Sequence, residues 1–282
     1  MHGTIGHSRE RRALRNSTAA ARILPVLPGD MIYHNGQVMR DTVQLYYIWY
    51  GSWATSTQNI LRDFGNTIGG TTWLDIVTTY YDTVGSCTSN VILGGEAIDA
   101  YSLGKTLSDT TVFSVVKAAM QAGKVPISAN ALYFVLTSSD VTESSGFCSQ
   151  YCGWHTSDSY TAGGTTYDIK YGFVGNPAAC PSSCAYSTLT PNNDVGADGM
   201  ASIIAHEVVE AMSDPDISAW SDASGNENAG ETTQVASLMH LLGRMVTLNL
   251  AFLVTHIDRI SCNERCNIPL QTSAPGRLER RI

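Results

Sequence analysis

Short hydrophobic runs alternate with segments of helical periodicity through most of the chain. Four runs rich in β-branched and aromatic side chains predict strands, at residues 43–50, 91–93, 131–136 and 167–174. Three other segments predict helices from apolar side chains three and four positions apart, at residues 55–68, 71–82 and 109–122. This alternation indicates one α/β (or α+β) domain over residues 31–229, with a mixed sheet and Cys-rich loops between its later elements.

The last predicted helix, residues 199–212, carries the candidate chemistry. His206 and Glu210 are four positions apart and therefore share one face of this helix. An imidazole and a carboxylate are good zinc ligands, and in the HExxH pattern of zinc peptidases the Glu after the first His is the general base. Here the fifth position is Glu instead of His. We predict a zincin-like HExxE helix, with His206 and Glu210 as zinc ligands and Glu207 as the catalytic base.

A solvated acidic helix face with a paired histidine is the alternative interpretation. The apolar neighbours of the motif weigh against it, because burying three ionisable groups is costly unless they are paired or bound to metal. A zinc site needs at least one further ligand. We expect Glu227, which follows a Gly-Asn turn, to be that ligand, with His155 as the next choice. Further acidic candidates lie downstream at Asp214, Asp216 and Asp222.

Six of the seven cysteines occur as CxxxC pairs, at Cys148/Cys152, Cys180/Cys184 and Cys262/Cys266, while Cys87 stands apart. The first two pairs lie in segments rich in Ser, Gly, Pro and Tyr, as loops do. Zinc sites more often use CxxC spacing, so disulfides are favoured over structural zinc in these loops. The spacing leaves open whether a disulfide forms within one CxxxC pair or between two. An odd count leaves at least one thiol unpaired in a monomer.

Composition and charge narrow the class of protein. Hydrophobic residues make up 43% of the chain and charged residues 15%, which supports a sizeable core. A net charge of -8 without a long basic stripe argues against nucleic-acid binding. Residues 1–30 are predicted to be a flexible tail. Residues 238–257 are apolar over a membrane-spanning length, but they include Arg244 and two histidines, so we favour a buried or amphipathic helix and expect no membrane span.

Several motifs occur in order along residues 31–229. They run from Tyr33 to Val38, Leu45 to Trp53, Ile92 to Glu96, Ala100 to Gly104, Tyr133 to Ser138, Phe147 to His155, Phe173 to Asn176, Cys180 to Tyr186 and Asn193 to Glu210. With these motifs the chain resembles the EXORDIUM family, also called phosphate-induced proteins, of plants and some microbes. The family's His-Glu-x-x-Glu helix is intact here, which supports a shared site.

The resemblance implies a secreted protein of the cell wall or apoplast, in a family that is tied in plants to cell expansion and growth signalling. Family members begin with a signal peptide, and residues 1–15 contain no apolar stretch of that kind. Residues 231–282 resemble nothing in the family, and our hypothesis for them is a gene-model artefact. The function predicted first is a zinc-dependent hydrolase acting on a peptide or cell-wall substrate. The alternative is a non-enzymatic extracellular protein of growth signalling or wall binding.

Overall fold

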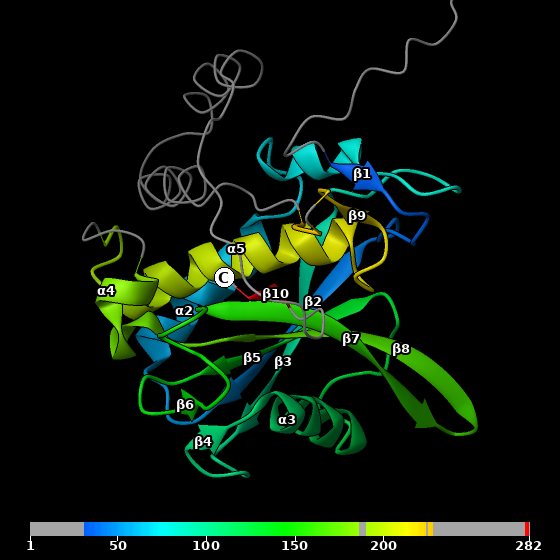
Figure 1. Ribbon diagram of the computed structural model, residues 1–282. Helices are drawn as coiled ribbons and strands as arrows, with labels where there is room; N and C mark the ends of the chain where they lie inside the picture. Colours follow the sequence, from blue (N-terminus) through cyan, green and yellow to red (C-terminus); the bar gives the residue numbers. More distant parts are fainter. Residues whose placement is uncertain (1–30, 186–189, 224, 228–279, 282) are drawn as a thin grey trace, which may run out of the picture. The chain divides into compact units, whose positions relative to one another are not determined.

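A six-stranded mixed sheet forms the centre of the part of the chain that the computed structural model describes, residues 31–185, 190–223, 225–227 and 280–281 (Figure 1). Its strand order is β10-β7-β8-β5-β2-β3. The strands are β2 (Val43–Tyr50), β3 (Val91–Asp99), β5 (Ala131–Thr137), β7 (Gly153–Ala162), β8 (Thr165–Val174) and β10 (Arg280–Arg281). The four strands β3, β2, β5 and β8 run parallel, whereas β7 pairs antiparallel with β8, and β10 antiparallel with β7.

Helices cover both faces of this sheet, as alternating strands and helices require. On one face lie α2 (Thr55–Thr67) and α5 (Val195–Ser213), and on the other lies α3 (Asp109–Gln121) (Figure 1). Strand β2 is buried on both faces. Leu45, Tyr47 and Trp49 pack on the side of α2 and α5, while the intervening residues pack on the side of α3. The period of two in a strand thus divides the core into two layers.

Shorter elements complete the fold. Two small sheets pair β1 (Ile32–Tyr33) with β9 (Trp220–Ser221) and β4 (Thr106–Leu107) with β6 (Thr142–Glu143). The remaining helical turns are η1 (Leu74–Thr79), η2 (Pro177–Ala179) and α4 (Pro181–Cys184). Within the described residues, no helix combines the length and the hydrophobicity that a membrane span needs. The predictions for residues 1–30, for residues 238–257 and for nearly all of 231–282 concern segments outside the described residues.

The predicted strands and helices are largely confirmed, and the longer elements differ from the prediction at three places. The helix expected over residues 71–82 is a six-residue 3₁₀ turn, η1. Strand β3 continues past Leu93 through Gly94 and Gly95, where the missing side chains make room for the ring of Tyr46, 2.8 Å from an ideal Cβ on Gly94. Strand β7 was not predicted, because only its first three residues are buried and the rest are mostly Ser, Thr and Asp.

Helix α5 is buried along nearly its whole length. Asp194 caps its first turn by accepting a hydrogen bond from the backbone N–H of Ala197 at 3.0 Å. From Gly196 to Ser213 every residue is buried except Ser202, which is half-buried. A helix with apolar residues on all sides needs cover on all sides. The sheet, α2 and the turns η1, η2 and α4 provide it. The charged residues of α5 are therefore held inside the protein.

Candidate functional site

Helix α5 brings three of the predicted site residues into the interior. His206, Glu207 and Glu210 are exposed by 2%, 0% and 4% of their surface. One helical turn separates His206 from Glu210, and the His206 Nε2 atom lies 3.0 Å from Glu210 Oε1. Both side chains therefore point toward the same point in space, as their spacing predicts.

Strand β7 supplies the fourth predicted residue, His155. It lies opposite Gly172 of β8, on the face of the sheet that α5 covers. Two positions earlier, Gly153 touches α5 itself. A Cβ built on Gly153 would lie 2.5 Å from Ile203 Cγ2 and 3.1 Å from Glu207 Oε1. The absence of a side chain at Gly153 thus lets α5 approach the strand and sets the position of Glu207 beside it.

Glu227, in the loop after β9, is the fifth member. Its Oε1 atom lies 3.3 Å from His155 Nε2, and Glu210 Oε2 lies 3.8 Å from the same nitrogen. His155 and Glu227 are exposed by 0% and 5%. All five predicted site residues therefore converge in one buried group, to which we refer as the His–Glu cluster. Within it, ligand atoms of His155, Glu207 and Glu210 lie within 4.8 Å of one another.

Burial and like charge dominate the electrostatics of this cluster. Burial raises the pKa of Glu207 well above its ordinary value, and the charges of Glu210 and Glu227 raise it further. Among the described residues, neither carboxylate oxygen of Glu207 has a hydrogen-bond partner. For His155, burial by itself lowers the pKa. The charge and hydrogen bond of Glu227, followed by the charges of Glu210 and Asp214, outweigh burial and raise that pKa.

The donor set fits a divalent metal ion. Four ligands arranged tetrahedrally at the usual zinc distance of ~2.1 Å lie roughly 3.4 Å from one another. Three pairs among these side chains bracket that spacing: His206–Glu210 at 3.0 Å, His155–Glu227 at 3.3 Å and His155–Glu210 at 3.8 Å. Three buried carboxylates also need positive charge nearby, since an uncompensated buried anion is costly. Imidazole nitrogens and carboxylate oxygens are the donors that zinc accepts.

The other acidic candidates serve local structure. Asp214 accepts the backbone N–H groups of Ser218 and Ala219, each at 2.6 Å, and so shapes the turn after α5. Burial raises the pKa of Asp214 to about 6, despite these two hydrogen bonds. Asp216 lies 3.6 Å from the Lys170 ammonium. Asp222 accepts the backbone N–H of Asn226 at 2.6 Å.

Sequence reasoning missed the role of Gly153 at this site. It also missed Lys170, a buried cation that lies two positions from Gly172 on β8 and contacts Asp168 at 2.6 Å. No spacing signal marks either residue, because each acts through the strand pairing of β7 and β8.

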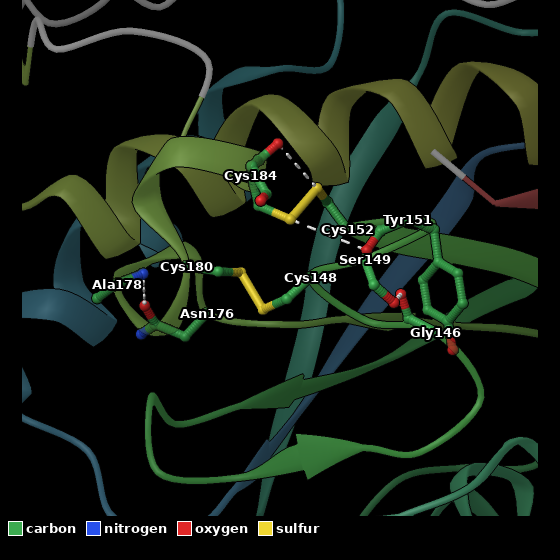
Figure 2. The surroundings of a disulfide bond; sticks show 10 residues. Gly146, Cys148, Ser149, Tyr151, Cys152, Asn176, Ala178, Cys180 and Cys184 are labelled. Carbon is green, nitrogen blue, oxygen red and sulfur yellow. Dashed lines mark hydrogen bonds between the residues drawn. A yellow bond between two sulfur atoms is a disulfide. The ribbon is translucent and has the colours of Figure 1, made fainter.

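Two disulfides join the first two CxxxC pairs, Cys148 to Cys180 and Cys152 to Cys184 (Figure 2). The prediction of disulfides in these loops is thus confirmed, and the pairing runs between the two CxxxC pairs. Cys152 directly precedes β7, and α4, which ends at Cys184, precedes α5 in the chain. The bonds therefore tie the strand of His155 to the segment before the helix of His206. Cys87 is a buried free thiol whose pKa burial raises to about 12, and Cys262 and Cys266 lie outside the described residues.

The family model and the similar proteins that match this chain all point to one protein family. The model of the phosphate-induced protein 1 conserved region matches residues 31–263. Protein EXORDIUM-like 3 of Arabidopsis thaliana is 37% identical over 214 residues, 67% of this chain and 63% of that protein. Protein EXORDIUM-like 5 of Arabidopsis thaliana is 34% identical over 67% of this chain and 58% of its own length.

A tobacco relative, Protein PHOSPHATE-INDUCED 1 of Nicotiana tabacum, is 29% identical over 65% of this chain and 64% of its own length. The chain thus spans 58–64% of the length of these relatives. No solved structure matches it. With the family's conserved region matching most of its length, the chain belongs to the EXORDIUM and phosphate-induced protein family.

Proposed function

We propose that this protein is an extracellular zinc-dependent hydrolase, most simply a peptidase, with the His–Glu cluster as its active centre. The observation that carries the proposal is Glu207. Its carboxylate is fully buried and has no hydrogen-bond partner among the described residues, yet it lies in reach of His155 and Glu210. A buried carboxylate without a hydrogen-bond partner lowers the stability of the fold by at least about 1–3 kcal/mol. Proteins therefore rarely keep such a group unless it has a function.

The five residues divide into ligands and a base. His206 and Glu210, one turn apart on α5, are the zincin-like pair, and their atoms meet at 3.0 Å. His155 and Glu227 approach from β7 and from the loop after β9, with their atoms 3.3 Å apart. Bound zinc polarises a substrate carbonyl and lowers the pKa of water to about 7. Glu207, adjacent to His206 in the chain, is left to act as general base.

Glu207 suits the role of base by its surroundings. Its carboxylate is fully buried, and neither oxygen has a hydrogen-bond partner among the described residues, so both are available to a water molecule. Gly153 of β7 lies beside this carboxylate, since a Cβ built there would be 3.1 Å from Glu207 Oε1. Glu207 can therefore take the proton of the attacking water and pass it to the leaving amine.

An extracellular location is part of the proposal. It is supported by the two disulfides, since such bonds form and persist in oxidising compartments. The membership of the EXORDIUM and phosphate-induced protein family agrees with it.

Metal analysis and a matched pair of variants test the proposal. Purified protein is expected to hold one zinc per chain and to cleave a mixed peptide library in a zinc-dependent way. Glu207→Gln is expected to keep the zinc and lose cleavage, while His206→Ala loses both. Asp63→Asn, which changes an exposed carboxylate of α2, is the control and should behave as wild type.

Two results would contradict the proposal that the protein is a zinc-dependent hydrolase. If purified protein takes up no zinc, the ligand assignment is wrong. If it binds zinc but Glu207→Gln behaves as wild type in every peptide and wall-glycan assay, the cluster holds metal without turnover. The non-enzymatic alternative then stands.

A further inference from the structure

Strand β7 presents a row of outward-pointing backbone groups that begins at the His–Glu cluster. Its hairpin with β8 turns through residues 163–164, two glycines with positive φ, so Ala162 and Thr165 form the first hydrogen-bonded pair. Such pairs recur at every second residue of an antiparallel ladder. At the other end, the carbonyl of Cys152 accepts the N–H of Gly175 at 3.2 Å. The even-numbered residues of β7 therefore bond to β8, and the odd-numbered ones point their N–H and C=O groups outward.

The outward row consists of His155, Ser157, Ser159 and Thr161. The His155 side chain contacts Glu210 of α5, and side chains two positions apart in a strand lie on one face, so the row follows the face that carries the cluster. Among the described residues, β10 pairs only with Trp154 and His155, and no other strand lies on that side of β7. The sheet edge from Ser157 onward is thus a template for a further strand.

The short strand β10 shows that this edge accepts an antiparallel strand beside the cluster. Arg280 lies opposite His155, and Arg281 lies opposite Trp154 (Figure 1). Because the backbone groups of His155 point outward, they are the groups through which the two strands pair. Bonds of this kind depend on the backbone of the added strand and not on its side chains, so another peptide can form them.

We propose that the outer edge of β7 is the substrate-binding edge of the His–Glu cluster, and that it takes an extended peptide segment as an antiparallel strand in place of β10. His155 is fully buried with β10 beside it, so a substrate must displace β10 to reach this position. The inference names the substrate class of the proposed hydrolase. It rests on that function for the cleavage, and on the strand geometry alone for the binding.

The direction of β7 determines which part of the substrate is recognised. A strand antiparallel to β7 runs from the Thr161 end toward His155, so the residues N-terminal to the cleaved bond lie along the outward row. At ~3.3 Å per residue, the row is about 20 Å long and accommodates roughly seven substrate residues. Only an unfolded or loop segment can offer its backbone groups to a sheet edge over that length. The site therefore selects extended polypeptide segments.

Binding of a synthetic peptide tests the proposal without turnover. The probe is a fluorescent peptide with the sequence of residues 276–282, and its anisotropy is measured with the whole chain in the Glu207→Gln background. Adding Arg280→Pro to the protein removes an N–H from β10 and should weaken its pairing with β7. We expect this protein to bind the probe roughly fivefold more tightly, the effect of one lost hydrogen bond. Adding Arg280→Ala instead keeps the N–H and should leave the affinity unchanged.

Two N-methylated probes are the matched control for the strand geometry. A methyl group on the nitrogen of Arg280 in the probe, which faces β7, should abolish binding. A methyl group on the nitrogen of Arg281, which faces away, should change the affinity less than about twofold. Equal effects of the two methyl groups would overturn the proposal, as would equal affinities of the Arg280→Pro and Arg280→Ala proteins or no binding by either. If circular dichroism shows that Arg280→Pro unfolds the protein, the methylated probes decide on the Arg280→Ala protein.

Substrate length gives the corresponding readout for cleavage. For a peptide that the wild type cleaves, removal of residues N-terminal to the cleaved bond should lower kcat/KM at least about tenfold more than removal of residues C-terminal to it. The opposite order would refute the predicted direction of the substrate. Failure of the hydrolase is distinguishable, because it appears as absence of cleavage while the probe still binds and still discriminates between the two methyl groups.

Discussion

Replacing Gly153 by alanine probes the contact on which the candidate site is built. The new methyl group would lie 2.5 Å from Ile203 Cγ2, 2.9 Å from the carbonyl oxygen of Phe173 and 3.1 Å from Glu207 Oε1. The carbonyl belongs to the central sheet and cannot move away. Either helix α5 or the side chain of Ile203 must therefore shift, and a shift of the helix also moves the carboxylate of Glu207.

Overpacking of this kind costs roughly 1–3 kcal/mol. In a folded region of about 200 residues, each kcal/mol lowers Tm by roughly 2–4 °C, so we expect a Tm about 2–12 °C below wild type. A displacement of a few tenths of an ångström at the general base should also reduce hydrolysis by roughly tenfold, since catalytic rates depend steeply on alignment. Differential scanning calorimetry and the peptide assay measure the two effects.

Gly85→Ala is the matched control. A Cβ there would meet only the Cδ atom of Arg40, at 3.8 Å, which is an ordinary contact, so its Tm should stay within about 1 °C of wild type. In the double variant Gly153→Ala/Ile203→Ala the clash with Ile203 is relieved, while the close contact with the Phe173 carbonyl remains. The combined loss should therefore be smaller than the sum of the two single losses. If Gly153→Ala has the Tm and the rate of peptide hydrolysis of wild type, α5 does not approach β7 as closely as described.

Three further outcomes follow from the structure. Glu207→Gln should lower peptide hydrolysis about 10²–10⁴-fold with unchanged zinc content, as measured by steady-state kinetics and metal analysis; a smaller loss would remove Glu207 as the base. The hydrogen bonds from Arg62 lower the pKa of Glu96 from 4.5, so this pair stabilises the fold fully above that pH and loses its effect as the pH falls. The stability difference between wild type and Glu96→Gln in urea melts should therefore be larger at pH 7 than at pH 3, and equal differences would refute this. Cys87, buried and with its pKa raised to about 12, should resist Ellman's reagent until guanidinium unfolds the protein, whereas rapid labelling of the native state would contradict its burial.

Local sequence patterns were sufficient to predict the helices and strands that bury a regular apolar face. Strand β2 and helix α3 follow directly from spacing, and α5 follows from the apolar residues around its HExxE motif. The convergence of His155 and Glu227 on α5 was a hypothesis from residue type and chain length. It required the sheet order, which places β7 beside β8, and no local spacing encodes that order.

Strand β7 shows why the remainder could not be predicted. Its buried end is Gly153, Trp154 and His155, too short for a period to be visible, and its pairing with β8 supplies what its sequence lacks. The disulfide pairing could not be predicted for a similar reason. Identical CxxxC spacing in both loops permits disulfides within each loop or between the loops. The positions of α4 and of the turn before β7 in the fold determine that they form between the loops.

The crossed order of the two disulfides makes one of them partly redundant as a restraint on the unfolded chain. Each bond spans 32 residues, which corresponds to about 3.7 kcal/mol of loop-closure entropy for the first bond to form. Once Cys148 is joined to Cys180, the second bond closes a circuit of only four residues on either side. The same relation then gives about 2.5 kcal/mol. Evolutionary loss of one bond would thus leave a chain still held at the same place, while loss of the second would release a loop that includes all of β7 and β8.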